Sequence, residues 1–359
     1  MQESANNKAS KARFMTSIQA SGRASLGSTC FGLKPGRSNL FGFGLLLCLS
    51  QAGAADALRL AVSMTPLSLP IFVAEKQGYF ADEGLQLAVQ EVVGGHRTMQ
   101  ILLEGKADLA TASEAVVMFN SFSASPQFAV LASFVSSSND SKIVLRPGSG
   151  ISQVKELKGR RIGTVLGTAS HYMLDTTLLA NGVDPGTVQI INLQPEAMAD
   201  LLKSGEVDAV AIWEPLPFKL LRSVPGSQVL SAPGGYRLSF NLIARKPLLG
   251  PRDEELQKFL RAMDRAERFI ASKPDQAQAL LRERLKLDQS FIDWIWPSYN
   301  YRLSLDQWLL ASLEAEARWA RQGGHVKSSA SGEHIPNYLD LIYTKPLRKV
   351  LPAGVGLIE

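Results

Sequence analysis

The chain has 359 residues and a mass of 38.9 kDa, of which 45% is hydrophobic and 20% charged. This globular composition excludes a disordered or fibrous protein, and the length favours about two domains. The net charge of +5 would suit a nucleic-acid partner, but residues 1–54 hold six of the 38 basic and one of the 33 acidic residues. The remaining 32 of each sign leave residues 55–359 neutral, so we expect no nucleic-acid partner.

Residues 1–54 have the parts of a secretory signal peptide that is cleaved on export. A basic segment leads to an apolar run at 40–49 that is too short to span a membrane, and Ala52-Gly53-Ala54 is a small-residue cleavage pattern. We therefore predict a periplasmic protein, with translation starting at Met1 or at Met15. Lipid attachment at Cys48 is disfavoured because Leu47 stands where such signals carry a small residue.

Both cysteines, Cys30 and Cys48, lie in this leader. The predicted mature chain therefore has no disulfide, no cysteine nucleophile and no cysteine metal ligand.

Strand and helix patterns alternate through most of the body, which predicts an α/β fold with largely parallel sheets. In the first half the predicted strands are 58–63, 85–92, 108–111, 128–134 and 142–145, and the predicted helices are 69–80, 96–103 and 114–122. In the second half the strands are 161–165, 188–193, 209–213 and 239–245, and the helices are 170–179, 196–202 and 216–221. So many repeats favour two α/β lobes over one sheet.

From residue 252 the pattern becomes helical. Apolar residues recur at helical spacing around Leu256–Ile270, and further helices are predicted at 276–285, 290–296 and 305–320. Residues 323–333 form a polar linker, and 335–351 is a last helical or irregular piece. We interpret the aromatic group Trp294, Trp296, Tyr299 and Tyr301 as core between helices, with a binding cage as the alternative.

Familiar catalytic patterns are absent. The sequence has no phosphate-binding loop, no nucleophile elbow and no zinc-protease motif, and its four histidines are scattered. We interpret His325 and His334 as solvated loop residues. We therefore expect no enzyme activity, no catalytic residue, no cofactor and no metal site.

Three predicted strand-to-helix turns are rich in small and hydroxyl residues: Gly94–Thr98, Thr111–Ser113 and Gly167–His171. Helix N-termini meet outside the carboxyl ends of parallel strands, where free N–H groups attract an anion. Thr168 or Ser170 could instead only cap its own helix. Trp213-Glu214-Pro215 ends another strand, with a buried Trp and a capping Glu as the alternative to ligand contact.

Five segments resemble the periplasmic substrate-binding proteins of ABC importers in the nitrate, sulfonate and taurine group, which also includes binders of thiamine-pyrimidine precursors. They are AEKQGYFADEGLQLAV (74–89), GKADLATAS (105–113), VKELKGRRIGTVLGTASHYML (154–174), LLKSGEVDAVAIWEPLP (201–217) and IPNYLDLIYTKPLRKV (335–350).

The resemblance implies a type II periplasmic-binding-protein fold, with a hinge between two α/β lobes and the C-terminal helices packed on lobe 1. Lobe 1 would comprise 57–142 and 246–350 and lobe 2 would comprise 143–245, with crossovers near 142–147 and 241–246. The ligand would lie between the lobes. The ligand-binding positions implied are Ser63, Met64, Thr65, Pro66, Gly95, Thr111, Ser113, Thr168, Ala169, Ser170, His171, Trp213 and Glu214.

The implied function is capture of a small anionic or zwitterionic organic compound and its delivery to ABC permease and ATPase subunits, by a monomer. No Arg lies in the loop after the first strand; Arg97 and Arg237 are candidates for an anion clamp. Glu114 and Asp140 suit a bare anion only if they turn away, so the ligand could be a zwitterion or a heterocycle. Alternatives are a binder of a thiamine-pyrimidine precursor or a ligand sensor acting through a membrane partner. Related enzymes that make this pyrimidine use a Cys-rich motif and a lysine that binds pyridoxal.

Overall fold

The computed structural model describes residues 57–232, 236–326 and 335–358. These residues belong to one compact unit, residues 54–359. The predicted signal peptide and His334 lie outside the described residues. Within the described ranges no helix has both the length and the apolar character needed to cross a membrane.

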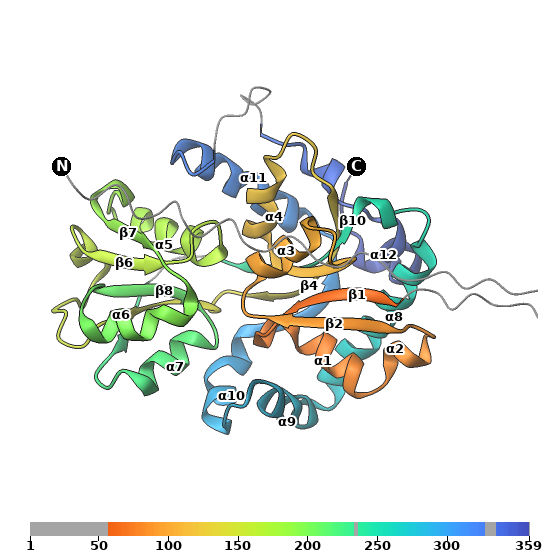
Figure 1. Ribbon diagram of the computed structural model, residues 1–359, viewed down its shortest axis with the longest axis horizontal. Helices are drawn as coiled ribbons and strands as arrows, with labels where there is room; N and C mark the ends of the chain where they lie inside the picture. Colours follow the sequence, from red (N-terminus) through yellow and green to blue (C-terminus); the bar gives the residue numbers. More distant parts are fainter. Residues whose placement is uncertain (1–56, 233–235, 327–334, 359) are drawn as a thin grey trace, which may run out of the picture. The chain divides into compact units, whose positions relative to one another are not determined.

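The first sheet has six strands in the order β11-β4-β10-β3-β1-β2 (Figure 1). β1 pairs in parallel with β2 and β3, whereas β10 runs antiparallel between β3 and β4, and β11 pairs antiparallel with β4. The bounds are β1 (Leu58–Ser63), β2 (Leu87–Val92), β3 (Leu109–Ser113), β4 (Phe128–Ser137), β10 (Leu238–Arg245) and β11 (Tyr299–Ser304).

The second sheet has five strands in the order β7-β6-β8-β5-β9. The bounds are β5 (Ser141–Leu145), β6 (Arg161–Thr164), β7 (Gln189–Asn192), β8 (Ala209–Trp213) and β9 (Gln228–Val229). Alternate residues of β5 face opposite sides: Ile143 and Leu145 pack with α5, and Val144 packs with α6 and α7. Both faces of this sheet are thus covered by helices, as Figure 1 shows, which accounts for its nearly continuous apolar strands.

Helices fill the connections and the C-terminal third. Their bounds are α1 (Leu69–Lys76), α2 (Tyr79–Asp82), α3 (Gly95–Leu103), α4 (Glu114–Ser121), α5 (Ala169–Ala180), α6 (Met198–Ser204), α7 (Leu216–Ser223), α8 (Asp253–Ser272), α9 (Pro274–Leu285), α10 (Gln289–Ile295), α11 (Gln307–Gln322) and α12 (Lys345–Val350). Short 3-10 turns lie at Pro66–Ser68, Val154–Leu157, Pro185–Thr187, Pro195–Ala197, Lys246–Leu248, Trp296–Ser298, Tyr338–Leu341 and Pro352–Gly354.

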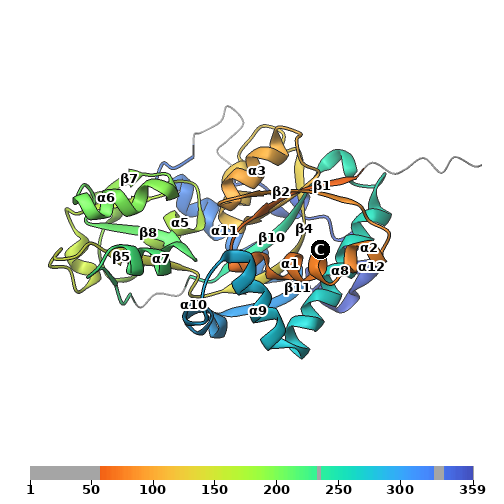
Figure 2. The same ribbon diagram turned by 60° about the horizontal axis from the view of Figure 1, so that its bottom comes forward.

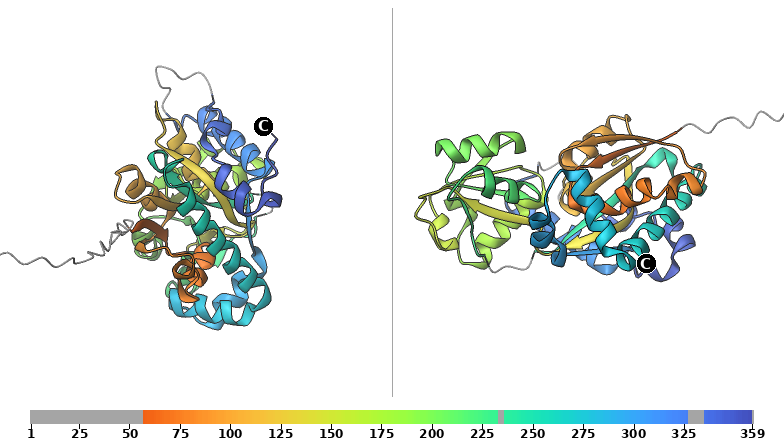
Figure 3. Two further views of the ribbon diagram at one scale, coloured as in Figure 1. Left: turned by 90° about the vertical axis from the view of Figure 1, so that its right-hand side faces the viewer. Right: turned by 90° about the horizontal axis from the view of Figure 1, so that it is seen from below.

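The C-terminal helices pack mainly on the first sheet's side. α8 contacts α1, α12 and β11, and α11 lies against α4 (Figures 2 and 3). α10 also reaches the second sheet's side, where Phe291 packs on Phe218 of α7 with ring centroids 5.2 Å apart. The C-terminal region therefore contacts the helices of both sheets.

Several details differ from the sequence-based expectation, among them the short strand β9, which was not expected. The helix expected at 69–80 is divided into α1 and α2, because Gly78 has φ +74° and α2 begins after it. β11 was not expected, since its residues lie between helical patterns and its partner β4 is over 160 residues away. The strand at 238–245, expected in lobe 2, pairs with β3 and β4 in the first sheet.

The chain therefore crosses between sheets earlier than expected on both passes. It leaves the first sheet after Ser137 and enters the second at Ser141; it leaves the second after Val229 and re-enters the first at Leu238. The pattern of apolar residues locates most of the strands but carries no information on which sheet accepts each one, since both environments are buried.

Candidate functional site

A small cavity lies where the two sheets approach each other. Its volume is about 30 Å³, whereas sites that hold small organic ligands commonly measure about 300–1,000 Å³. The cavity walls are therefore closed on each other in this structure. The residues that line the cavity are Ser63, Thr65, Leu67, Gly95, His96, Ser113, Val116, Asp140, Thr168, Ala169, Trp213, Leu238 and Phe240.

Three helices begin at this cavity, and none of them has a side-chain cap. The N-cap residues of α3, α4 and α5 are Gly94, Ser113 and Thr168, and no side chain of these accepts from the first helical turn. Thr168 Oγ1 instead donates to the carbonyl of Val165 at 2.7 Å. The capping alternative for Thr168 is thus not what the structure shows, and the positive end of α5 is open to a ligand.

Glycine lets α3 approach the first sheet closely. A Cβ on Gly95 would lie 2.9 Å from Cα of Ala112 in β3. The preceding Gly94 has φ +93°, and a Cβ there would lie 3.0 Å from Cζ2 of Trp213. Both glycines are therefore required by the space around the cavity.

Hydroxyl groups at the ends of β1 and β3 hold the cavity wall. Thr111 Oγ1 accepts from the backbone N–H of Ser63 at 3.0 Å, and Ser63 Oγ accepts from Gly94 N–H at 3.2 Å. Thr65 Oγ1 is buried, lines the cavity and has no partner among the described residues. Thr111 thus positions the wall, while Thr65 leaves a hydroxyl free for a ligand.

Asp140 brings a carboxyl group to the cavity from the crossover between the sheets. Its Oδ1 accepts from the hydroxyl of Tyr299 at 2.6 Å, and its buried Oδ2 has no partner within the described chain. Burial raises the pKa of Asp140 to about 7. From the sequence, Asp140 was named only as a group that a bare anion would need turned away, and it was not among the expected binding residues.

His96 also lines the cavity and was missed. Burial lowers its pKa to about 4, so the ring is neutral at pH 7, and its Nδ1 is without a partner in the described structure. The ring lies edge-on to Trp213, with centroids 6.0 Å apart. Its place directly after Gly95, at a helix start, was the available signal.

Seven of the thirteen expected ligand-binding residues line the cavity: Ser63, Thr65, Gly95, Ser113, Thr168, Ala169 and Trp213. Of the other six, Thr111 lies behind the wall as described. Met64 lines a separate surface pocket with Phe72, and the carbonyl of Pro66 accepts from Tyr301 at 3.3 Å. Ser170 is buried against Ser141, with their hydroxyl oxygens 3.0 Å apart.

His171 points away from the cavity into an aromatic group. Its ring lies 5.0 Å from that of Trp319 and 4.6 Å from that of His325. Burial lowers its pKa to about 3. His171 comes two positions after Ala169 on α5, so its ring lies on a different face of the helix from the residue that lines the cavity.

Glu214 is fully buried beside the cavity rather than in its lining. Oε1 forms an ion pair with Lys142 Nζ at 2.9 Å and accepts from Trp294 Nε1 at 2.6 Å. The four residues of the expected aromatic group therefore have separate roles. Trp294 donates to the Glu214 carboxylate, while the ring of Tyr301 contacts those of Trp296 and Tyr299.

The other charged side chains near the cavity already have partners among the described residues. Glu114 accepts from Tyr236 and from Ser239 N–H at 2.8 Å, so its carboxyl turns away from the cavity. Arg97 forms a two-pronged ion pair with Glu196, at 2.6 and 2.9 Å, and so joins α3 to the turn after β7. Arg237 stacks over Trp308 and does not line the cavity.

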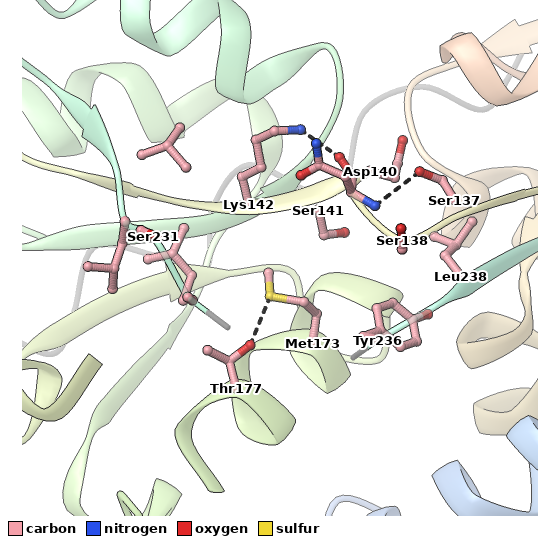
Figure 4. Close-up of a pocket in the computed structure, with 15 residues that line it drawn as sticks. Ser137, Ser138, Asp140, Ser141, Lys142, Met173, Thr177, Ser231, Tyr236 and Leu238 are labelled. Atoms are coloured by element: carbon pink, nitrogen blue, oxygen red, sulfur yellow. Dashed lines mark hydrogen bonds between the residues drawn. The ribbon is translucent and has the colours of Figure 1, made fainter. Parts of the chain in front are cut away.

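A second pocket of about 280 Å³ lies at the two crossovers (Figure 4). Asp140 lines both this pocket and the cavity. The pocket also contains Ser137, Ser138 and Tyr236, and Lys142 donates to the carbonyl of Asn139 at 2.6 Å. The pocket therefore lies beside the segments that must bend if the sheets separate.

Comparison with known proteins identifies the family to which the chain belongs. A family model described as NMT1/THI5 like matches residues 65–277. Proteins of several Brucella strains are 26% identical over 148 residues, which are 40% of this chain, and the chain spans 46% of their length. The taurine-binding periplasmic protein of Escherichia coli is 26% identical over 162 residues, covering 45% of this chain and 50% of that protein.

An enzyme is also among the relatives. The 4-amino-5-hydroxymethyl-2-methylpyrimidine phosphate synthase of Schizosaccharomyces pombe is 29% identical over 146 residues, 40% of each chain. Among solved structures, the alkanesulfonate-binding protein SsuA of Xanthomonas axonopodis bound to MOPS superposes with a TM-score of 0.69 at 16% identity. The superposition covers 82% of this chain and 100% of the SsuA chain.

Proposed function

The chain belongs to the NMT1/THI5-like family and has the periplasmic-binding-protein fold, and from that premise we propose that it is an extracytoplasmic solute-binding protein. It captures a small anionic or zwitterionic organic compound between two lobes and delivers it to the permease of an ABC importer. The expected export signal agrees with this location.

The two lobes of this proposal follow the sheets. Lobe 1 comprises 57–140 and 238–358, lobe 2 comprises 141–232, and the crossovers form the hinge. A cavity of about 30 Å³ must open to admit a ligand, so the lobes separate and close again around it. The crossover pocket gives the hinge room to move.

One observation carries the proposal: the uncapped N-termini of α3 and α4 from the first sheet and of α5 from the second meet at one cavity. First-turn N–H groups and the helix dipoles bind an anion without a guanidinium group. Because the donors come from both lobes, an anion that bridges them also favours the closed arrangement.

Asp140 refines the class of ligand. A carboxyl group with one oxygen free beside a bare anion would weaken its binding, whereas a ligand with an ammonium or amino group satisfies that oxygen. We therefore favour a zwitterion with an acidic end at the helix starts and an amino end at Asp140. Taurine, which the Escherichia coli relative is named for, has this chemistry.

The cavity also favours a second candidate, an amino-substituted pyrimidine. Trp213 and His96 offer ring surfaces to a flat heterocycle, and Asp140 can accept from its amino group. The relative from Schizosaccharomyces pombe is named for synthesis of such a pyrimidine. We propose binding rather than synthesis here, because the cavity lining contains neither the lysine nor the cysteines on which those enzymes depend.

Thermal unfolding against a ligand panel tests the proposal. The panel contains taurine, alkanesulfonates, nitrate, amino-sulfonates and aminopyrimidines. A ligand at about 1,000 times its dissociation constant adds roughly 4 kcal/mol of stability, which raises the midpoint by several degrees. Mass spectrometry of the denatured protein identifies a ligand already bound, and its recovery unchanged after incubation supports binding without catalysis.

Thr168 offers a charge-matched pair of variants. Thr168→Asp and Thr168→Asn place side chains of nearly equal shape at the N-cap of α5, and both residue types cap helices well. If an anionic group binds there, the Asp variant should bind at least tenfold more weakly than the Asn variant. Equal affinity of the two variants would show that no anionic group of the ligand binds at the start of α5.

A further inference from the structure

Three metal-binding side chains meet on the side of α5 that faces away from the cavity. His171 and Asp175 are four residues apart on α5, so they lie on one face of the helix, and His325 follows the end of α11. One donor atom of each lies within 4.8 Å of the donor atoms of the other two. Among the described residues, no other group of three or more His, Cys, Asp or Glu side chains brings its donor atoms this close together.

The hydrogen bonding of this cluster is incomplete. His171 and Asp175 are 2% and 1% exposed, yet both ring nitrogens of His171 and Oδ1 of Asp175 have no partner among the described residues. The contact that does form is between Asp175 Oδ2 and His325 Nε2, at 3.3 Å. Buried polar atoms are nearly always satisfied, so three such atoms in one cluster need a partner that the described residues do not supply.

The surroundings hold the cluster in place. Trp319 Nε1 donates to Asp175 Oδ2 at 3.1 Å, and the Trp319 and Phe119 rings pack around His171. A Cβ on Gly323 would overlap the ring of His325, so glycine at this position allows the ring to fold back toward α5. Outer contacts of this kind fix the orientation of metal ligands.

We propose that His171, Asp175 and His325 bind a divalent transition-metal ion of the zinc class. Two imidazoles and one carboxylate are the donor set that zinc accepts, with a fourth position left for water. The side chain of His325 is 25% exposed, which gives the ion a path from solvent. The proposal replaces the expectation that these histidines are scattered and that the chain has no metal site.

The site would link the two lobes. α5 packs on the second sheet, whereas α11 packs on α4 beside the first sheet. A metal ion held by His171 and Asp175 on one side and His325 on the other therefore restrains α5, whose first residue, Ala169, lines the cavity. This role is independent of which solute the cavity binds.

The test is zinc binding by the full chain, expressed without a polyhistidine tag and stripped with a chelator. We expect one equivalent of Zn²⁺ by titration calorimetry and a visible absorption band when Co²⁺ replaces it. His325→Ala should lower the affinity by about 100-fold or more, since even loss of an outer contact costs 10–100-fold. Asp200→Ala, which removes an exposed carboxylate on α6, should leave it unchanged.

Gly323→Ala provides a variant that keeps all three ligands. Its added methyl group displaces the His325 ring, so zinc affinity should fall while circular dichroism and solute binding stay close to wild type. Zinc binding of equal strength in wild type, His325→Ala and Gly323→Ala would overturn the proposal, as would less than half an equivalent in the wild type. Solute binding in the zinc-free protein is scored separately, so failure of this site leaves the proposed function intact.

Discussion

At the scale of single residues, Glu214 illustrates how a strand-end motif can mislead. The carboxylate lies just after the end of β8, beside the cavity, but it forms an ion pair with Lys142, which is itself buried. Two charges removed from water depend on each other, and loss of one partner leaves the other uncompensated. Glu214 thus supports the structure next to the site.

Glu214→Gln should therefore destabilise the fold by about 3–5 kcal/mol, because it removes the ion-pair partner of the buried Lys142 ammonium. Urea unfolding without ligand measures this. The double variant Glu214→Gln, Lys142→Met should regain part of the loss, since neither charge remains. If the double variant is less stable than the single one, the ion pair does not account for the effect.

Buried carboxyl groups also give the protein a pH dependence. Burial raises the pKa of Asp140 to about 7 and of Glu267 to about 8, above the ordinary value near 4 in an unfolded chain. The folded state then binds more protons than the unfolded state between about pH 4 and 8. These carboxyl groups therefore lower the free energy of unfolding as pH rises through this window, whereas His96 and His171, whose pKa values burial lowers, raise it as pH rises to about 7.

Unfolding of the wild type and of Glu267→Gln in urea at pH 5 and pH 8 measures the contribution of the carboxyl group. Glu267→Gln should make the fall due to the carboxyl groups smaller by about 1–4 kcal/mol, because one to three pKa units correspond to that range. Glu267 accepts from Leu303 N–H at 2.8 Å, which an amide oxygen can also do. The same change in stability between pH 5 and 8 in the wild type and in Glu267→Gln would show that Glu267 is not protonated in the fold.

At the scale of elements, the site depends on how closely α3 approaches β3. The turn at Gly94-Gly95 lets the helix begin against the sheet, with its first N–H groups at the cavity. The same principle places α4 and α5, where short polar residues end a strand and begin a helix. These turns, rather than long charged side chains, form the site.

Gly95→Ala should destabilise the protein by about 1–3 kcal/mol, since its Cβ would overlap the backbone of Ala112. Gly159→Ala is a matched control: Gly159 has φ +75° but open space around its Cα, so only backbone strain is added. Solute affinity should fall for Gly95→Ala and stay unchanged for Gly159→Ala. Calorimetry on both variants checks this, and unchanged affinity in Gly95→Ala would contradict the role of α3.

At the scale of the whole described unit, exposed ion pairs add to the buried contacts that join the sides of the two sheets. Arg97 on α3 and Glu196 after β7 form a partly exposed ion pair, and Arg222 on α7 pairs with Asp288 before α10. Exposed pairs contribute about 0–1 kcal/mol each. These two pairs can bias closure but cannot dominate it.

Arg97→Ala should therefore weaken solute binding by no more than about fivefold, by lowering the population of the closed form. The effect should shrink at high salt, and a double-mutant cycle with Glu196→Gln should assign it to the pair. Loss of binding by more than 100-fold would instead mean that Arg97 contacts the solute itself.

The sequence by itself determined the elements and the chemistry of the turns. Periodicity located nearly every strand and helix of residues 57–322, and small hydroxyl residues at three helix starts predicted the open N-termini at the cavity. These are local properties, since a strand or a helix start is specified by residues within a few positions of it.

Only the tertiary structure decided which elements and side chains come together. The place of β10 in the first sheet, the unexpected strand β11 and the burial of Glu214 against Lys142 all depend on partners far away in the sequence. The same holds for His325, which lies about 150 residues from His171 and Asp175 along the chain. On α5 only two positions separate Ala169, which lines the cavity, from His171, which faces away from it, and packing decides which of them reaches the cavity.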